Sequence, residues 1–466
     1  MSTSLSAPPS DPPPAPPRQT LQWHLRRTLL LAGPLILSRV GLIAMTTTDV
    51  VVLGRAGADE LAYYVLGYAI VDSLVAVMAG LQLGVPILTA RTLGEGRAEQ
   101  AAGIWRRGLI FALVVGLLLA LIMQPASQVF AAMGHEPTLA FEGGAVTAMI
   151  AFAIPFMGLY LVSAMFLEAL ERPIIGTIAV GIATLVNFGF SVALVFGIGP
   201  IPALGAWGCA LATVMTSFLL GVGLALYVRF ALKDRARYGL GRTVDAPMDG
   251  REQRKLGFAA GASYGLEAGS FTVLTMIAGL VGVLGLASMG VLFQILALSF
   301  MVSFGIAGAT QVRVGNAWGR GDAHGMEVAG WVGFALSLVL TLIICAVVLA
   351  FPRFFLGLLT TDQAVLAAAL PGMIWMVAAL LADGGQTVLN HACRGRGDSW
   401  VPTSFHAVSY WLIMIPLGWL FAITLDHGTI GLFQAILVAS LFSMTVMAMR
   451  FIYLSRKGLP PIARAV

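Results

Sequence analysis

Five ionisable side chains stand inside long apolar stretches of the sequence. Four are acidic and one is basic: Asp49, Asp72, Glu267, Asp383 and Arg39. A charge at the centre of a bilayer costs about 2.5–3.5 kcal/mol on insertion scales, so those retained usually face a cavity or a partner and are functional. A net acidic interior suits cations, namely protons, sodium ions or organic cations. No nucleophile elbow, HExxH pair or phosphate loop occurs, so we expect no enzyme.

Asp383 and Asp49 each have local sequence that admits two interpretations. Asp383 precedes Gly384, Gly385 and Gln386, small and polar residues that allow helices to approach closely. It is either a coupling carboxylate, with Gln386 beside it, or a packing hydrogen bond. Asp49 follows three threonines and is either a coupling site or a carboxylate that those threonines bind.

Arg39 and Asp72 have matching depths on either side of a turn centred near Gly57. Arg39 lies 18 residues before Gly57 and Asp72 lies 15 after it. At 1.5 Å of helix rise per residue, their depths differ by only about 4–5 Å. We therefore expect a structural ion pair between them. The alternative is that Arg39 reaches Asp383 or Glu267 and is displaced by an arriving cation.

The composition requires these residues to be held in a membrane. Of the 466 residues 58% are hydrophobic and only 11% are charged, and the mean hydropathy is +0.90. A water-soluble domain has about 25% charged residues. The apolar runs are long enough for an all-α integral membrane protein with twelve transmembrane helices. These are expected near 29–53, 61–88, 108–125, 143–167, 174–196, 204–229, 257–280, 285–312, 328–351, 364–391, 400–422 and 429–454.

The basic residues predict how the helices are oriented. With the N-terminus inside, 24 of the 27 Lys and Arg residues fall in inner segments, two (Arg55 and Arg353) in outer loops, and Arg39 in the first helix. This bias places both termini in the cytoplasm. It also explains the net charge of +5 without a nucleic-acid partner. The excess of arginine over lysine suggests a bacterial inner membrane.

The two halves of the chain resemble each other. A shift of 225 residues places Gly54, Gly57, Gly80, Gly94 and Gly96 on other glycines. With six helices in each half, the repeats are parallel, and two such bundles form a central cavity that can alternate its access. We expect a carrier that works as a monomer. Its segments are a disordered proline-rich tail (1–20), two six-helix lobes (21–230 and 257–455), the cytoplasmic loop between them (231–256) and a cytoplasmic tail (456–466).

Several short motifs, each at the expected helix, carry a family resemblance. They are Pro34–Ser38 and Asp49–Gly54 in the first helix, Phe166–Pro173 after the fourth, Asn187 with Gly205–Thr213, Asp383–Gln386, and the turn Arg394-Gly395-Arg396-Gly397-Asp398. Together they resemble the multidrug and toxic compound extrusion (MATE) family in its NorM-type branch, and the resemblance runs from about residue 25 to 455. It implies the MATE fold, ion and substrate coupling at Asp383, and proton coupling at Asp49 with Asn187 nearby.

One departure from the family pattern concerns the seventh helix. The NorM-type glutamate expected ten residues after Gly261 is replaced by Phe271, and Glu267 lies one turn earlier. Glu267 either replaces that carboxylate or does not. A sodium site near Asp383 and Glu267 is therefore possible. We favour proton over sodium as the coupling ion, because a proton needs only one carboxylate.

The predicted function is a secondary antiporter that exports amphipathic, mainly cationic drugs in exchange for H⁺ or Na⁺. No cofactor is expected; the partners are small organic cations and the lipid bilayer. The alternative is a flippase for a lipid-linked sugar or cell-wall precursor. Such a cavity should be rich in Arg and Lys for binding phosphate, and this sequence offers Arg39 alone against four acids.

Overall fold

The computed structural model describes residues 20–200, 202–241 and 250–457. Within these ranges the chain is helical and contains twelve segments that could cross a membrane, which confirms the predicted fold class. Most of the proline-rich tail and part of the inter-lobe loop lie outside the described residues. The first six spans are α1 (Leu21–Ala56), α2 with α3 (Ala58–Leu81, Gly84–Gly94), η1 with α4 (Ala98–Gln100, Ala101–Ile122), α6 with α7 (Pro137–Ile150, Ala153–Ala169), α8 (Pro173–Phe196), and α9 with η2 (Gly205–Leu226, Tyr227–Ala231).

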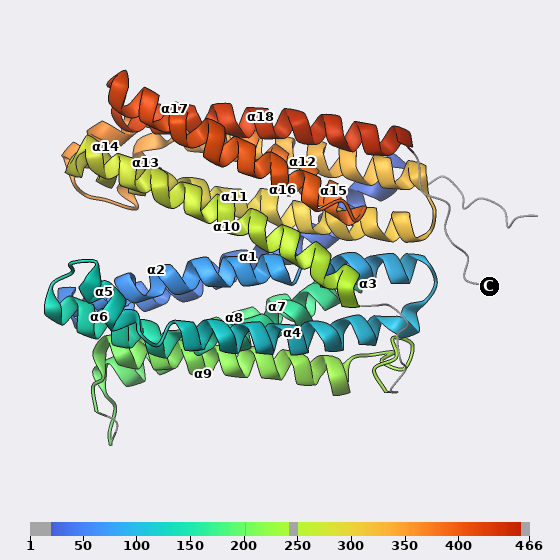
Figure 1. Ribbon diagram of the computed structural model, residues 1–466, viewed down its shortest axis with the longest axis horizontal. Coiled ribbons are helices and arrows are strands. Elements are labelled where there is room, and N and C mark those ends of the chain that lie inside the picture. The colour runs from blue at the N-terminus through green and yellow to red at the C-terminus, as the bar shows by residue number, and fades with distance from the viewer. Residues whose placement is uncertain (1–19, 201, 242–249, 458–466) are drawn as a thin grey trace, which may run out of the picture.

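The second six spans repeat this arrangement. They are α10 (Gly250–Val281), α11 (Val283–Gly319), α12 (Ala323–Ala350), α14 with η3 and α15 (Gln363–Ala369, Leu370–Gly372, Met373–Gly395), the segmented span α16, η4, α17 and η5 (Trp400–His406, Ala407–Met414, Ile415–Trp419, Leu420–Thr424), and α18 (Gly428–Lys457). Short helices α5 (Ala126–Ala132) and α13 (Pro352–Gly357) lie between spans. Figure 1 shows the two sets of helices as two lobes lying side by side.

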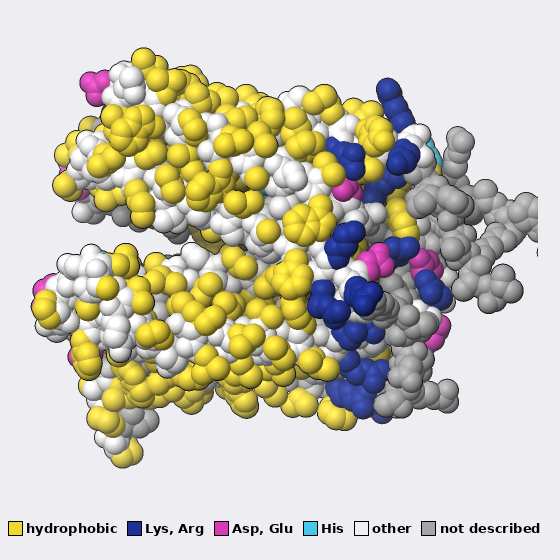
Figure 2. Space-filling model, viewed as in Figure 1, with side chains coloured by type: hydrophobic (Ala, Val, Ile, Leu, Met, Phe, Trp, Pro, Cys, Tyr) yellow, Lys and Arg dark blue, Asp and Glu magenta, His cyan; other side chains and the backbone are white. Residues whose placement is uncertain are grey.

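The two ends of the molecule differ in charge and in shape. Lys and Arg side chains form a band near one end, where the chain enters α1 and leaves α18, and we call this the basic end. Figure 2 shows the lobes touching there and separated by a cleft at the other end, the open end. The cleft leads toward the middle of the molecule, between the lobes.

Several helices run past the apolar stretches that predicted them. The span expected at 257–280 begins at Gly250, and the one expected at 285–312 continues to Gly319. The helical backbone satisfies its own hydrogen bonds beyond the apolar core, so polar residues extend the helix toward the basic end. Prolines account for two breaks in the membrane-spanning helices, between α2 and α3 and between α6 and α7. Pro86 and Pro155 cannot donate to the carbonyls four residues earlier, and the helices break near those carbonyls, at 82–83 and 151–152.

At the basic end the lobes meet through closely packed helix backbones. A Cβ atom at Gly84 would lie 2.3 Å from the carbonyl oxygen of Gln253, and one at Gly257 would lie 2.1 Å from that of Leu81. These contacts join α2 and α3 of the first lobe to α10 of the second. Because any side chain would fill the space, glycine is what permits the close approach.

Candidate functional site

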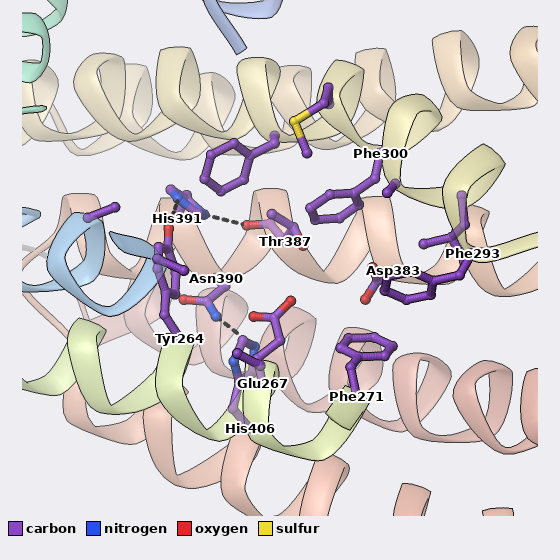
Figure 3. A pocket seen from close by; sticks show the side chains of 17 residues that line it. Tyr264, Glu267, Phe271, Phe293, Phe300, Asp383, Thr387, Asn390, His391 and His406 are labelled. Atoms are coloured by element: carbon purple, nitrogen blue, oxygen red, sulfur yellow. Dashed lines mark hydrogen bonds between the residues drawn. The ribbon is translucent and has the colours of Figure 1, made fainter. Parts of the chain in front are cut away.

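A cavity of about 350 Å³ lies between the lobes, and most of its wall belongs to the second lobe. Figure 3 shows it with its lining side chains drawn. Helix α2 contributes two alanines, and α10, α11, α15 and α16 contribute the rest. The lining residues are Ala76, Ala79, Tyr264, Glu267, Ala268, Phe271, Phe293, Leu296, Ala297, Phe300, Met301, Phe304, Asp383, Thr387, Asn390, His391 and His406.

The cavity wall combines aromatic rings with two carboxylates. Glu267 and Asp383, which the sequence singled out, are its acidic residues, and no Lys or Arg lines it within the described residues. The Glu267 carboxylate makes no hydrogen bond or ion pair with another described residue. Its charge is therefore available to a ligand in the cavity. Phenylalanine faces and an unpaired carboxylate together suit an organic cation.

Asp383 is held from one side. Gln386 Nε2 (3.1 Å), Ser440 Oγ (3.3 Å) and the Tyr410 hydroxyl (3.4 Å) all donate to its Oδ1. No described residue donates to Oδ2. The adjacent glycine allows α15 to approach α11, since a Cβ at Gly384 would lie 2.4 Å from Ser303 Oγ. This arrangement orients the carboxylate and leaves one oxygen available.

The Gln386 amide, also a predicted site residue, links Asp383 to a buried histidine. Because Gln386 donates to Asp383, its Oε1 must face the other way, where His406 Nε2 lies 2.9 Å from it. His406 Nε2 also lies 2.7 Å from Asn390 Nδ2, so the histidine ring contacts the side-chain amides of both Gln386 and Asn390. His406 Nδ1 lies 2.7 Å from Ser263 Oγ, which extends the network to α10. Sequence reasoning missed His406 because nothing in its local sequence distinguishes it from a packing residue.

Tyr264 separates the cavity from a smaller chamber toward the basic end. Its hydroxyl lies 3.3 Å from His391 Nε2, and His391 Nδ1 donates to the Thr387 carbonyl at 2.9 Å. The smaller chamber shares Tyr264, His391 and Phe304 with the cavity and continues to Glu168. These shared side chains form the floor of the cavity.

Asp49 occupies a second polar site, inside the first lobe. It is fully buried, and its oxygens accept from Ser191 Oγ (2.8 Å), the Tyr64 hydroxyl (3.0 Å) and Thr213 Oγ1 (3.2 Å). Asn187 is also fully buried, one turn before Ser191 on α8, and neither polar atom of its side chain has a hydrogen-bond partner. This side-chain amide is therefore available to a ligand.

The threonines before Asp49 do not bind its carboxylate. Thr46 and Thr47 donate to the carbonyl of Ile43, and Thr48 donates to that of Ala44. A threonine in a helix often bonds to the preceding turn in this way. The interpretation of Asp49 as a residue bound by its neighbouring threonines was wrong. Its partners come from α2, α8 and α9.

The predicted ion pair between Arg39 and Asp72 is also wrong. Arg39 Nη2 lies 3.7 Å from Glu168 Oε1, and its guanidinium stacks on the Phe304 ring 5.2 Å away. Asp72 instead accepts from the Tyr68 hydroxyl at 3.2 Å. Matching depth did not bring the two together, because depth alone does not determine which way a side chain faces around its helix.

The motif from Arg394 to Asp398 builds a turn at the basic end. Gly397 adopts a φ of 86°, which favours glycine, and its amide donates to the Arg394 carbonyl at 2.7 Å. Asp398 Oδ2 accepts from Arg450 Nε at 2.8 Å, which ties the turn to α18. A Cβ at Gly395 would lie 2.8 Å from the Gln311 carbonyl oxygen. Gly395 therefore allows α15 to pack closely on α11.

Arg394 and Arg313 are buried, although the sequence placed them among cytoplasmic basic residues. Arg394 has no exposed surface, its guanidinium lies 5.5 Å from the centre of the Tyr264 ring, and its three nitrogens have no hydrogen-bond partner. Arg313 donates to His24 and Thr28. The protein interior is thus less acidic than the sequence suggested, while the cavity wall itself remains acidic.

Among the described residues no group of three or more His, Cys, Asp or Glu side chains could hold a metal ion. Phe271, which stands where a family glutamate was expected, packs against Phe293 with ring centroids 5.3 Å apart and against Tyr410 at 6.0 Å. It closes the apolar wall beside Asp383 and offers no ligand oxygen. A sodium ion at this place would depend on Glu267, Asp383 and neighbouring neutral groups.

Comparison with known proteins assigns the chain to a family. The family model MatE matches residues 34–193 and 260–420, one match in each lobe. The chain belongs to the MatE family. A protein of Caulobacter vibrioides described as "probable multidrug resistance protein NorM" is 35% identical over 93% of both chains. A protein of Mesorhizobium japonicum with the same description is 32% identical over 92% of this chain and 94% of that one.

Solved structures show the same fold. The eukaryotic MATE transporter AtDTX14 superposes with a TM-score of 0.85 at 18% identity, over 94% of this chain and 98% of that one. An outward-facing multidrug resistance MATE transporter superposes with a TM-score of 0.81 at 18% identity, over 93% and 95%. The MATE chain described here is therefore a multi-pass membrane protein of a transporter family, not of an enzyme family.

Proposed function

We propose that this MATE protein is a secondary active multidrug exporter that moves amphipathic organic cations across the bacterial inner membrane in exchange for protons. One observation carries the proposal. The cavity between the lobes is lined mainly by aromatic and aliphatic side chains, and Glu267 and Asp383 are its acidic residues, with no Lys or Arg in the described wall. The NorM descriptions of its relatives agree with multidrug export.

The shape supports alternating access by a single chain. The lobes touch at the basic end and part at the open end, and Tyr264, His391 and Phe304 form the floor between them. With Lys and Arg on the cytoplasmic side, as the positive-inside rule expects, the cleft opens away from the cytoplasm and both termini lie inside. Both lobes and the cavity belong to one chain, which supports function as a monomer.

The hydrogen bonding of the two buried aspartates favours proton coupling. Asp49 is enclosed by three hydroxyl donors, and Asp383 keeps one oxygen for the cavity. One buried carboxylate is sufficient to carry a proton between two sides of a membrane. No cofactor is needed for such an exchange.

Asn187 is the observation that favours sodium instead. Its unpaired amide lies one turn from Ser191, which binds Asp49. Amide, hydroxyl and carboxylate oxygens are the ligands that hard cations prefer. Sodium coupling at this place is the second candidate, and separately imposed gradients distinguish the two.

The flippase alternative requires a cavity that binds phosphate. A lipid-linked precursor would need Arg or Lys in the wall, and the described wall has none. The fold alone does not distinguish a flippase from a cation exporter. A Pyrococcus furiosus transporter with a TM-score of 0.82 at 17% identity, over 92% of this chain and 96% of that one, is described as having a binding pocket of reverse polarity.

The test is export of a cation against a matched anion. Reconstituted protein should export ethidium from proteoliposomes under an imposed proton gradient and should leave carboxyfluorescein inside. Export of carboxyfluorescein but not of ethidium would contradict the proposal. Glu267→Gln should reduce ethidium export, and Glu142→Gln, which changes a half-buried glutamate outside the cavity, should not.

A further inference from the structure

A line of side chains on α2 joins the buried Asp49 to the surface of the molecule. Tyr64, Tyr68 and Asp72 are spaced four residues apart and therefore share one face of the helix. The Tyr64 hydroxyl donates to Asp49 Oδ2 at 3.0 Å, and the Tyr68 hydroxyl donates to Asp72 Oδ1 at 3.2 Å. The two rings stack, with centroids 5.6 Å apart and planes 9° from parallel.

Burial decreases steadily along this line. Asp49 has no exposed surface, Tyr64 is 1% exposed, Tyr68 is half-buried and Asp72 is exposed. Ala76, four residues after Asp72 on the same face, lines the central cavity. Asp72 therefore lies beside the cavity, where water in the cleft can reach it.

Asp72 has no counter-ion among the described residues. Arg39, which the sequence suggested as its partner, lies against Glu168 instead. Tyr68 is the hydrogen-bonding partner that the structure shows for Asp72, and it occupies Oδ1. Oδ2 is left to solvent, so the carboxylate can both take up and release a proton.

We propose that Asp72 and Tyr68 relay protons from the water of the cleft to Asp49 through Tyr64. This inference rests on the proposed function, in which Asp49 carries the coupling proton. A phenol hydroxyl both donates and accepts a hydrogen bond, so it can pass a proton on without changing its own charge. Asp49 itself has no contact with solvent and needs such a route.

The transfer conserves protons at every step. In the proposed relay, Tyr64 gives its hydroxyl proton to Asp49 Oδ2 and takes one from a water molecule that enters from the cleft and bridges the two phenols, whose ring centroids are 5.6 Å apart. The water takes one from Tyr68, which takes one from protonated Asp72. Both phenols and the water regain the protons that they lost, and Asp72 is protonated again from the cleft. Only O–H bonds exchange, so a sodium ion cannot follow this route.

The surroundings of the line fit this role. Besides Tyr64, the Asp49 carboxylate faces the hydroxyls of Ser191 and Thr213, and the Cys209 thiol lies 3.9 Å from Ser191 Oγ. These groups hold Asp49 in place but lead away from the cleft, toward α8 and α9. The face of α2 is the side from which a proton arrives.

The test compares variants of the relay with matched controls in proteoliposomes. Asp72→Asn and Tyr68→Phe should lower the initial rate of ethidium export under a proton gradient at least fivefold and leave equilibrium ethidium binding unchanged. Asp72→Glu should keep most of the rate. Two neighbours on α2 that are outside the line serve as controls, and Asp59→Asn and Tyr63→Phe should behave as wild type. Added formate, a small acid, should restore part of the rate of Asp72→Asn, which a structural role would not explain.

The outcomes separate the relay from the function on which it rests. If Asp49→Asn is inactive while Asp72→Asn and Tyr68→Phe transport at the wild-type rate, the relay is wrong and the proposed function stands. If Asp72→Asn loses ethidium binding together with transport and formate restores nothing, Asp72 is structural and the relay is again wrong. If Asp49→Asn transports normally, the proposed proton coupling at Asp49 is wrong, and the relay that depends on it is wrong as well.

Discussion

Gly94 of the first lobe and Gly319 of the second lie directly against each other at the basic end. A Cβ at Gly94 would be 3.0 Å from the Cα of Gly319, and a Cβ at Gly319 would be 2.1 Å from the Arg91 carbonyl oxygen. The two glycines are equivalent positions of the internal repeat, related by the shift of 225 residues. Equivalent residues meet in this way where they lie close to the axis of a two-fold relation between the lobes.

Substitution at this joint should open the basic end. Gly94→Ala or Gly319→Ala adds a methyl group where backbone atoms already touch, and overpacking of this kind costs about 1–3 kcal/mol. Spin labels at Glu99 and His324, one exposed on each lobe near the basic end, should move apart in either variant. Gly223→Ala is the control, because that helical glycine has open space around it. An unchanged distance distribution in both joint variants would show that the glycines do not control closure.

Asp383→Asn should greatly reduce coupled export without unfolding the protein. Asparagine keeps the volume and can still accept from Gln386, Ser440 and Tyr410, so the network around α15 survives. The variant loses the negative charge that Oδ2 presents to the cavity. The initial rate of export and the melting temperature should be measured together. Wild-type export by Asp383→Asn would make this carboxylate structural.

Glu267→Gln should weaken the binding of organic cations. The Glu267 carboxylate makes no hydrogen bond or ion pair with a described residue, so it can interact directly with a cation bound in the partly apolar cavity. We expect about a tenfold loss of ethidium affinity, which corresponds to about 1.4 kcal/mol. Fluorescence titration of the purified protein measures this directly. Equal affinity for ethidium in the variant and the wild type would exclude Glu267 from the binding site.

Glu136, at the open end of the first lobe, should make the thermal stability of the protein slightly dependent on pH. Its side chain accepts from the backbone amides of Leu139 (2.9 Å) and Thr138 (3.1 Å) at the start of α6. These two hydrogen bonds, with Leu139 the larger cause, lower the pKa of Glu136 below its usual value. At pH values above the unfolded-state pKa of Glu136, its ionised carboxylate therefore stabilises the folded protein. That stabilisation is lost as the pH falls through the lowered folded-state pKa. The difference in melting temperature between wild type and Glu136→Gln should shrink in acid; a constant difference would contradict this.

Sequence patterns predicted the fold better than they predicted which side chains contact each other. Apolar length and the positions of Lys and Arg were enough to predict twelve helices, because membrane insertion depends on these averaged properties of each segment. The side-chain contacts of Arg39 and Asp72 depend instead on the rotation of each helix about its axis, which hydropathy in this apolar chain scarcely encodes. Arg394 shows the same limit. It ends an apolar helix beside other basic residues, and only packing against Tyr264 distinguishes it from a solvated charge.

The acidic candidates were found because intramembrane charge is rare. Their supporting groups were not predictable, since Tyr64, Ser191 and Thr213 come from three helices and resemble ordinary packing residues in sequence. Asp49 and its partners are separated by up to 164 residues along the chain. A single sequence carries no signal for such contacts.

Proton-driven export of organic cations is best tested by ethidium efflux from proteoliposomes under separately imposed proton and sodium gradients. Proton coupling should give efflux with the proton gradient alone and none with the sodium gradient alone. Asp49→Asn should stop the proton-driven efflux, while Glu267→Gln should reduce it through weaker binding and leave it proton-dependent. Efflux driven by a sodium gradient alone, and abolished by Glu267→Gln, would contradict proton coupling and place a coupling sodium ion at Glu267 and Asp383.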